Sequence, residues 1–144
     1  MKQFGLLWLL FITTSILSFS QVKPADKNAI LNAMNKQKND WNEGNLKKYM
    51  AYYWNSDSLQ FIGKSGVTYG WYATLEKYQK SYPDKATMGV LSFGDINITR
   101  LSRKHILVTG SWKLQRENDE LKGYYSLIWE KIKGEWVIIV DHSS

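Results

Sequence analysis

The stretch His105–His142 reads HILVTGSWKLQRENDELKGYYSLIWEKIKGEWVIIVDH, and it decides the fold class. Apolar and polar residues alternate through it with a period of two, which is typical of β-strands with one buried face. Together with the residues just before it, the stretch divides into four strands. The connections between the strands are short, so we expect consecutive antiparallel hairpins. We place the strands at 88–101, 105–117, 120–132 and 135–142.

The register of these hairpins predicts which side chains lie together. Two-residue turns at 118–119 and 133–134 place Trp112 opposite Tyr125, and Tyr125 opposite His142, on neighbouring strands. These three side chains then form a row on one face of the sheet, near one end.

The two faces of the predicted sheet differ in composition. One face is nearly all apolar and should meet the helices, whereas the other is mixed and should face water or a second subunit. A three-residue loop at 102–104 fits this division because it keeps Ile98 with Val108 and Ile96 with Gly110, although a β-bulge would undo that pairing. The apolar face consists of Val108, Gly110, Trp112, Leu114, Tyr125, Leu127, Trp129, Trp136, Ile138, Val140 and His142.

Amphipathic helices precede these strands. Apolar residues at i, i+4, i+7 and i+11 predict a first helix over 27–43, with Asp26 as its N-cap and Gly44 as its stop. Asn45 can cap a second, shorter helix. A similar stripe predicts a third helix, which Pro83 closes. The three stripes are Ile30, Met34, Gln37 and Trp41, then Leu46, Met50, Tyr53 and Trp54, and finally Trp71, Leu75, Tyr78 and Tyr82.

The order of these elements predicts an α+β domain with helices packed on one face of a curved sheet. A brief apolar strand at 59–62 lies between the second and third helices and is ended by Gly63 and Gly66. No linker or internal repeat divides residues 21–144, which therefore form a single domain.

Residues 1–20 are typical of a signal peptide. A positive start is followed by the apolar run Phe4–Leu17, and the small residues Ser18 and Ser20 precede Gln21. The apolar run is shorter than the roughly 20 residues that a membrane-spanning helix needs, although an uncleaved anchor is the alternative. We therefore expect a periplasmic or secreted protein with no membrane attachment after removal of the leader.

Composition excludes several classes of function. The formal net charge is +6, but the lysines lie singly or in pairs beside acidic residues, so we interpret them as a solvated surface and expect no nucleic-acid partner. The chain has two histidines and no cysteine, and it has no HxH or HExxH pair, so we expect no metal site. It also lacks a GxSxG motif and a phosphate-binding loop, and no cofactor is indicated.

The row formed by Trp112, Tyr125 and His142 is the candidate catalytic site. A histidine among aromatic rings can exchange a proton near neutral pH, and the Tyr125 hydroxyl can position it. Asp141 cannot serve as its carboxylate, because successive side chains of a strand point to opposite faces unless the strand has ended or bulged. Asp57 is the best alternative. The competing interpretations are a packed histidine at 142 and a turn or cap residue at 57.

The chain is rich in aromatic residues, with seven tryptophans and nine tyrosines. Rings of this size fill a core or line a cavity between helices and sheet. Gly110 on the inner face leaves either room for a ligand or a bend in the sheet. The candidate ligand-binding residues are Trp41, Tyr53, Trp54, Phe61, Trp71 and Trp112.

Several short stretches carry a resemblance to a known family. They are DWNEGNL at 40–46, YW at 53–54, TYGW at 68–71 with YPD at 82–84, GSW at 110–112, and the ending from GEW at 134–136 to DHSS at 141–144. In this order they resemble the nuclear transport factor 2-like superfamily, and within it the SnoaL-like branch related to the association domain of calcium/calmodulin-dependent kinase II. The resemblance implies a cone-shaped, strongly curved antiparallel sheet wrapped around three N-terminal helices, with a cavity inside and dimerisation through the sheet.

The resemblance does not transfer an activity, because function lives in sites grafted on a fold. Our first hypothesis is an exported protein with a small-molecule pocket, whether an isomerase, a cyclase, a hydrolase or a binder without catalysis. The alternative is a non-catalytic dimerisation or partner-binding module that uses the mixed outer face of the sheet. A homodimer is expected in either case.

Overall fold

The computed structural model describes residues 21–144, and the signal peptide predicted for residues 1–20 lies outside the described residues. The helices are α1 (Pro24–Asn42), α2 (Leu46–Tyr49), the 3-10 turn η1 (Met50–Tyr52), α3 (Trp71–Ser81) and α4 (Lys85–Met88). The strands are β1 (Gln60–Gly63), β2 (Gly66–Tyr69), β3 (Val90–Arg100), β4 (His105–Gln115), β5 (Glu120–Ile132) and β6 (Glu135–Ser143).

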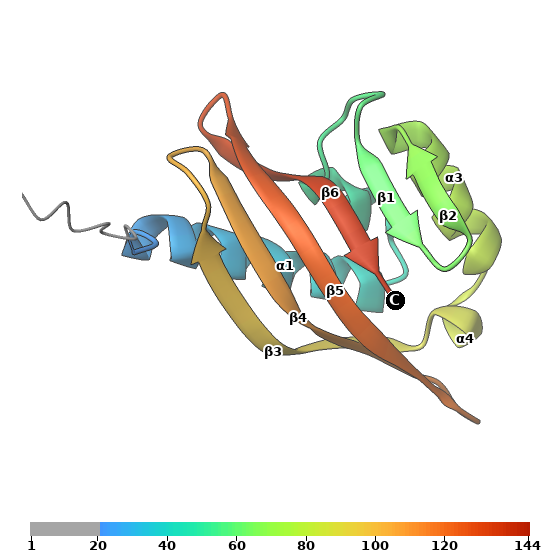
Figure 1. Cartoon of the computed structure of the whole chain (residues 1–144). Helices are drawn as coiled ribbons and strands as arrows, with labels where there is room; N and C mark the ends of the chain where they lie inside the picture. The colour runs from blue at the N-terminus through green and yellow to red at the C-terminus, as the bar shows by residue number, and fades with distance from the viewer. Residues whose placement is uncertain (1–20) are drawn as a thin grey trace, which may run out of the picture.

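One curved sheet holds all six described strands in the order β2-β1-β6-β5-β4-β3. Helix α1 crosses behind the long strands, and α3 lies beside the β1–β2 hairpin (Figure 1). The predicted α+β architecture of a curved sheet around N-terminal helices is therefore confirmed. The sheet is mixed, because β1 runs parallel to β6 and all other neighbours are antiparallel.

The predicted helices are present, with one change at the first N-terminus. Helix α1 begins at Pro24, which suits the first helical turn because it lacks a backbone N–H. Asp26 is therefore not the N-cap. Its Oδ1 accepts hydrogen bonds of 3.0 Å from Lys131 Nζ and from Trp136 Nε1, which fasten the start of α1 to the far hairpin. The predicted stop is confirmed, since Gly44 follows the helix with a φ of +81°.

The third helix follows the prediction closely, whereas the second is shorter than its predicted stripe, because Tyr53 and Trp54 lie beyond the 3-10 turn that ends at Tyr52. Asn45 caps α2, because its Oδ1 accepts a hydrogen bond from the backbone N–H of Lys48 at 3.0 Å. Helix α3 ends just before Tyr82 and Pro83. Two short elements, β2 and α4, were not predicted. Each has only four residues, most of them at least partly exposed, so no buried periodic pattern marks it.

The register of the β4–β5 hairpin differs from the predicted one. Its loop has four residues, 116–119, so Trp112 lies opposite Gly123 and Tyr125 lies opposite Gly110. The change amounts to two residues along the strand and therefore leaves every side chain on its predicted face. The two-residue turn at 133–134 is confirmed.

A β-bulge in the β5–β6 pair has a larger effect. Trp129 pairs with Ile138 as predicted, but Ile128 pairs with Val140, so the register shifts by one residue. A one-residue slip turns the rest of the strand over. Asp141 therefore faces the helices, and His142 is exposed on the outer face.

A second bulge lies in β3 between Gly94 and Asn97. The predicted pairing of Ile98 with Val108 is confirmed, but the pairing of Ile96 with Gly110 is wrong because the bulge intervenes. At the start of β3, the side-chain amide of Asn42 on α1 accepts from the backbone N–H of Leu91 at 2.7 Å and donates to its carbonyl at 3.1 Å. The Asn42 side chain therefore attaches the end of α1 to the start of β3, the edge strand of the sheet.

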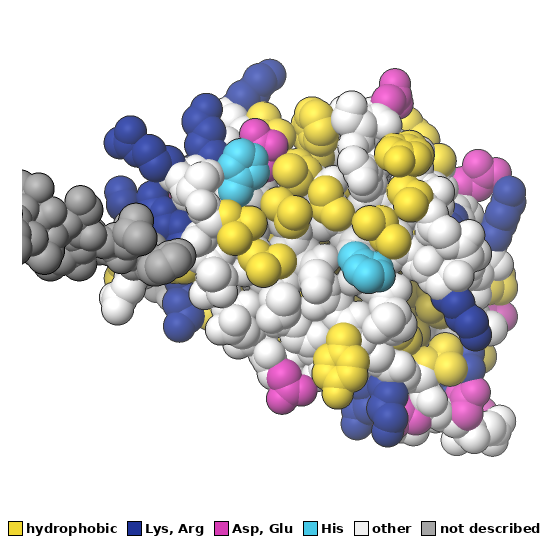
Figure 2. All heavy atoms as spheres, in the orientation of Figure 1, with side chains coloured by type: hydrophobic (Ala, Val, Ile, Leu, Met, Phe, Trp, Pro, Cys, Tyr) yellow, Lys and Arg dark blue, Asp and Glu magenta, His cyan; other side chains and the backbone are white. Residues whose placement is uncertain are grey.

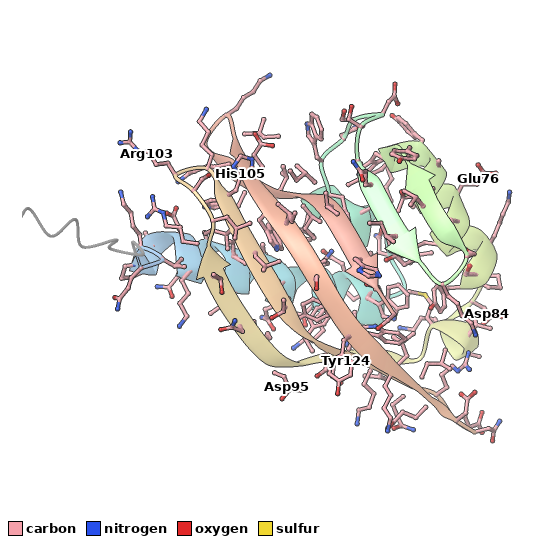
Figure 3. All side chains as sticks on the ribbon, viewed as in Figure 1. Glu76, Asp84, Asp95, Arg103, His105 and Tyr124 are labelled. Atoms are coloured by element: carbon pink, nitrogen blue, oxygen red, sulfur yellow. The ribbon has the colours of Figure 1, made fainter. Side chains whose placement is uncertain are left out.

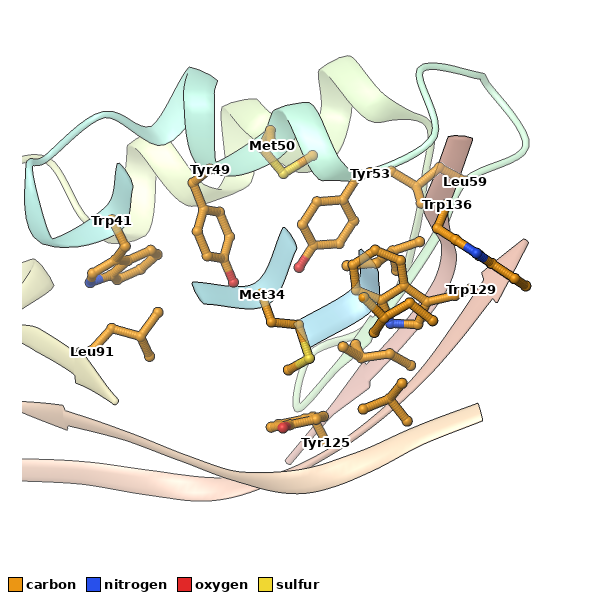
Figure 4. Packing of buried hydrophobic residues seen from close by; sticks show 14 of the residues in the cluster. Met34, Trp41, Tyr49, Met50, Tyr53, Leu59, Leu91, Tyr125, Trp129 and Trp136 are labelled. Carbon is orange, nitrogen blue, oxygen red and sulfur yellow. The ribbon is translucent and has the colours of Figure 1, made fainter. Parts of the chain in front are cut away.

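The core lies between the helices and the middle of the sheet. Figure 4 shows the helical layer above the strands, with Met34, Trp129 and Trp136 packed between them. Within residues 21–144, no helix is long and apolar enough to cross a membrane.

Candidate functional site

A cavity of about 770 Å³ opens between the helices and the concave face of the sheet. This volume is within the range of roughly 300–1,000 Å³ that is usual for small-molecule sites. Aromatic side chains from both layers line it. The exposed residues Lys64, Ser65, Lys122 and Ser144 border it and mark its mouth, beside the tip of the β1–β2 hairpin.

Asp141 is the one carboxylate among the lining residues, and its side chain is only 3% exposed. Its Oδ2 accepts a 2.6 Å hydrogen bond from the Tyr53 hydroxyl, and its Oδ1 accepts a 2.7 Å bond from Ser143 Oγ. Burial raises the pKa of Asp141 above its usual value, and the two hydrogen bonds offset part of that rise. A carboxylate has about four lone-pair sites, so each oxygen keeps an acceptor position for a ligand.

Three tyrosines surround this carboxylate on the helical side. The rings of Tyr49 and Tyr53 lie 6.0 Å apart, and those of Tyr49 and Tyr78 lie 5.4 Å apart. In Figure 4 the hydroxyls of Tyr49 and Tyr53 point from the helical layer toward the sheet. Burial raises the pKa of all three tyrosines, and the negative charge of Asp141 raises it further. These phenols therefore stay protonated at neutral pH and act as neutral donors.

Two side chains that line the cavity carry buried donors without a partner. The Tyr125 hydroxyl and the Trp112 Nε1–H are buried, and neither forms a hydrogen bond within the described part of the chain. Burial is the main cause that raises the pKa of Tyr125 to about 12, so its hydroxyl also stays protonated. A buried donor without an acceptor costs free energy, which a ligand oxygen can recover.

Gly110 is required by the position of one of these donors. A Cβ at this residue would lie 2.3 Å from the Tyr125 hydroxyl oxygen and 2.8 Å from the carbonyl of Gly94. The Tyr125 ring lies across the glycine of the neighbouring strand and meets Phe93 edge to face at 5.6 Å. The space predicted beside Gly110 is therefore filled by a ring of the protein itself.

The structure brings five of the nine candidate site residues to the cavity wall: Trp41, Tyr53, Phe61, Trp112 and Tyr125. The remaining four, His142, Asp57, Trp54 and Trp71, do not line it.

The predicted position of His142 is wrong. Its imidazole is exposed on the outer face of the sheet, because the bulge between Ile128 and Trp129 inverts the end of β6. Asp141, which was predicted to face outward, takes the inner position instead. The predicted row of three side chains is therefore not formed, because Tyr125 pairs with Gly110 and Ser143, Trp112 pairs with Gly123, and Asp141 pairs with Leu127.

Asp57 lies in an exposed turn ahead of β1, as its competing interpretation stated, and it does not supply a carboxylate to the cavity. Trp71 belongs to the core, where its Nε1–H donates to the carbonyl of Met50 at 2.8 Å. Trp54 is half-buried, and its backbone N–H donates to Ile138 of β6 at 2.9 Å. This bond, together with the parallel bridge between Tyr53 and Ile138, places Tyr53 beside the strand that carries Asp141.

Sequence reasoning missed Asp141, Tyr49 and Tyr78 as cavity residues. Tyr78 was visible as part of a helical stripe, and Tyr49 lies one residue before a stripe position. Nothing in the pattern of β6 signals the bulge that turns Asp141 inward. Among residues 21–144, no group of three or more His, Cys, Asp or Glu side chains is arranged to hold a metal ion.

No family model matches the chain, and no curated protein sequence matches it. Solved structures do match. An NTF-2 like protein of unknown function from Shewanella oneidensis MR-1 is 39% identical, with 82% of this chain and 98% of that chain covered and a TM-score of 0.78. A nuclear transport factor 2 (NTF2-like) superfamily protein from Salmonella enterica serovar Typhimurium is 20% identical over 82% of this chain and 89% of that chain, with a TM-score of 0.66. An NTF2-like protein of unknown function from Pseudomonas putida KT2440 is 12% identical over 86% and 89%, with a TM-score of 0.71.

Proposed function

The chain belongs to the NTF2-like family, and we propose that it binds a small, largely apolar molecule in the cavity of its cone, with Asp141 as the acid–base group. The observation that carries the proposal is Asp141 itself. It is a carboxylate that is 3% exposed, held by a 2.6 Å hydrogen bond from Tyr53, in a cavity otherwise lined mostly by rings and neutral polar groups. A buried carboxylate with a raised pKa in a cleft is a candidate for function.

The chemistry open to Asp141 is proton transfer within the bound molecule. The ionised carboxylate accepts a proton from a C–H or O–H group of the ligand and becomes neutral, and the same oxygen returns the proton at another atom. The raised pKa favours this exchange, because a general acid–base works best near the operating pH. The Tyr53 and Ser143 hydroxyls hold the carboxylate in place.

Such a group serves isomerase, cyclase and hydrolase chemistry alike, and it also serves as a polar anchor in a binder without catalysis. The proposal includes export of the protein, on the strength of the leader pattern in residues 1–20. The ligands that bind in the cavity will identify the substrate and the class of reaction.

A dye and a compound library test the proposal together. N-phenylnaphthylamine, an uncharged dye whose fluorescence rises in apolar surroundings, should bind the mature chain. A thermal-shift screen of metabolites should yield compounds that displace it, because a ligand raises the melting temperature by mass action.

Three variants locate the binding. Leu121→Trp adds bulk to the cavity wall and should abolish dye binding. Asp141→Asn keeps the shape of the side chain. It should weaken the binding of the metabolites that displace the dye by roughly tenfold or more, which corresponds to the loss of a hydrogen bond with a charged group. His142→Gln, on the outer face, is the matched control and should change neither. Equal binding by wild type and Leu121→Trp, or a loss of binding in His142→Gln, would refute the proposal.

The outer face of the sheet favours an assembly role beside this one. Figure 2 shows hydrophobic side chains gathered over this face, and Figure 3 shows Tyr124 upon it, 70% exposed. We propose a homodimer formed through this face, since monomers rarely expose large apolar patches. The apolar side chains on it are Ile62, Val67, Tyr69, Leu107, Tyr124, Ile128, Val137 and Ile139.

Sedimentation tests the dimer. Ile128→Lys places a charge in the patch and should convert a dimer to a monomer that still binds the dye, whereas Tyr72→Lys on the exposed side of α3 should remain dimeric. A wild-type protein that sediments as a monomer at all concentrations would contradict the assembly role and leave the cavity proposal intact.

A further inference from the structure

The charged groups that line the cavity are unevenly distributed. Three lysines, Lys64, Lys77 and Lys122, lie at or near its mouth, and Asp141 is the single acidic side chain in its wall. Lys122 is partly neutralised, because its Nζ lies 3.2 Å from a carboxylate oxygen of Glu120. Neither Lys64 nor Lys77 forms an ion pair within residues 21–144. Among the side chains at the mouth, positive charge is therefore in excess.

Lys77 is held over the mouth by the surrounding residues. Its Nζ donates a 3.3 Å hydrogen bond to Thr68 Oγ1 of β2 and lies 5.2 Å from the centroid of the Phe61 ring. Phe61 lines the cavity, so the ammonium group sits at the border between the apolar interior and water. An ammonium has three N–H donors, and two remain for a ligand.

The interior of the cavity also favours a ligand with acceptor oxygens, but through neutral hydrogen-bond donors instead of cations. The Tyr125 hydroxyl, in a side chain only 4% exposed, and the Trp112 Nε1–H are buried donors without an acceptor on side chains that line the cavity. The Tyr53 hydroxyl is already used by Asp141. Apart from Asp141, the charged side chains that line the cavity are therefore cations and its buried groups without a partner are donors, so its complement is a molecule that carries acceptor oxygens.

We propose that the cavity selects organic anions: molecules with an apolar, ring-sized body that enters among the aromatic side chains and an acidic head group that stays between Lys77 and Lys64. This inference rests on the proposed function, because it names the class of ligand for the same cavity. The acidic head group stays with the lysines at the mouth, and acceptor oxygens on the body meet Tyr125 and Trp112.

A matched pair of dyes tests the head group. Anilinonaphthalene sulfonate and N-phenylnaphthylamine share the same ring body, and only the first carries a sulfonate. We expect the wild-type protein to bind the sulfonate dye more tightly at low salt. We expect added salt to weaken the binding of the sulfonate dye and to leave the binding of the uncharged dye unchanged, since ions screen charges at a partly exposed site.

Two double variants with the same loss of charge assign the effect. The double variant Lys64→Gln with Lys77→Gln should weaken the binding of the sulfonate dye about 3- to 10-fold, the range for two partly exposed ion pairs. The affinity for the uncharged dye should stay the same. Lys47→Gln with Lys48→Gln, on α2 and outside this cavity, should alter neither dye.

The outcomes separate this inference from the proposed function. Equal affinity of the wild-type protein for both dyes, or an equal loss of sulfonate binding in the two double variants, overturns the selection of anions and leaves the cavity as a binding site. Failure of both dyes to bind overturns the cavity function and this inference with it.

Discussion

Removal of one hydroxyl should show whether the buried carboxylate is charged. In Tyr53→Phe, Asp141 loses the donor that lies 2.6 Å from its Oδ2. Both side chains are 3% exposed, so water does not readily take the donor's place. A hydrogen bond to a charged group contributes about 1.5–3 kcal/mol, and its loss should reduce the folding equilibrium constant roughly 10- to 150-fold at neutral pH. Urea unfolding followed by tryptophan fluorescence measures this change.

The cost of Tyr53→Phe should depend on pH with a defined sign. Burial gives Asp141 a folded pKa above its unfolded value, so the protein loses stability as the pH rises from the unfolded pKa through the folded one. The bond from Tyr53 lowers that folded pKa, and the variant should therefore keep losing stability at higher pH than the wild type. The difference between the two proteins should be small in acid and should develop above the folded pKa of the wild type.

A double-mutant cycle with Asp141→Asn supplies the control. An amide in place of the carboxylate removes the charge, so Tyr53→Phe should cost less in that background, and the two changes should couple by about 0.5–3 kcal/mol. A coupling energy of zero, or an equal cost of Tyr53→Phe in acid and at neutral pH, would refute the argument that an ionised Asp141 depends on this hydroxyl.

Three further changes have effects that the contacts define. Gly110→Ala places a methyl group 2.3 Å from the Tyr125 hydroxyl, so we expect about 1–3 kcal/mol of destabilisation by urea unfolding and a changed cavity; an unchanged midpoint would contradict that contact. Asn42→Ala leaves the N–H and the carbonyl of Leu91 without their side-chain partner, and hydrogen exchange at that N–H should become faster, with about 1–3 kcal/mol lost overall. The hydrogen bond from Lys131 of β5 lowers the pKa of Asp26, so the carboxylate stabilises the folded protein at pH values above its unfolded pKa. Asp26→Ala should therefore destabilise the protein at neutral pH. It should have little effect in strong acid, where the wild type has lost the same contribution. A pH-independent cost of this last change would count against an ionic contact.

The fold could be predicted from the sequence because its long elements carry strong periodic signals. Alternation over 88–142 and the helical stripes upstream place four strands and three helices. The short elements β2 and α4 are stabilised by contacts with the rest of the fold, which local patterns do not reveal. The relation to the association domain of calcium/calmodulin-dependent kinase II stays a prediction, as do the leader, export and the dimer.

The site was predicted less well, and the reason is geometric. Side-chain facing survives a two-residue error of register, as at Trp112 and Tyr125, but it does not survive a one-residue bulge. The bulge between Ile128 and Trp129 exchanges His142 for Asp141 at the inner face. Residues of ordinary strand character flank this bulge, so the sequence contains no glycine or proline that announces it.

The position of β6 in the sheet has a consequence for how the protein matures. This strand follows every other strand in the chain, yet it lies between β1 and β5 in the middle of the sheet. Until it is inserted, the β1–β2 hairpin has no partner, and the residue that meets Tyr53 from 88 positions away is missing. Until β6 pairs with both, the β1–β2 hairpin and the long strands therefore leave unpaired strand edges, which make partly folded chains prone to aggregate.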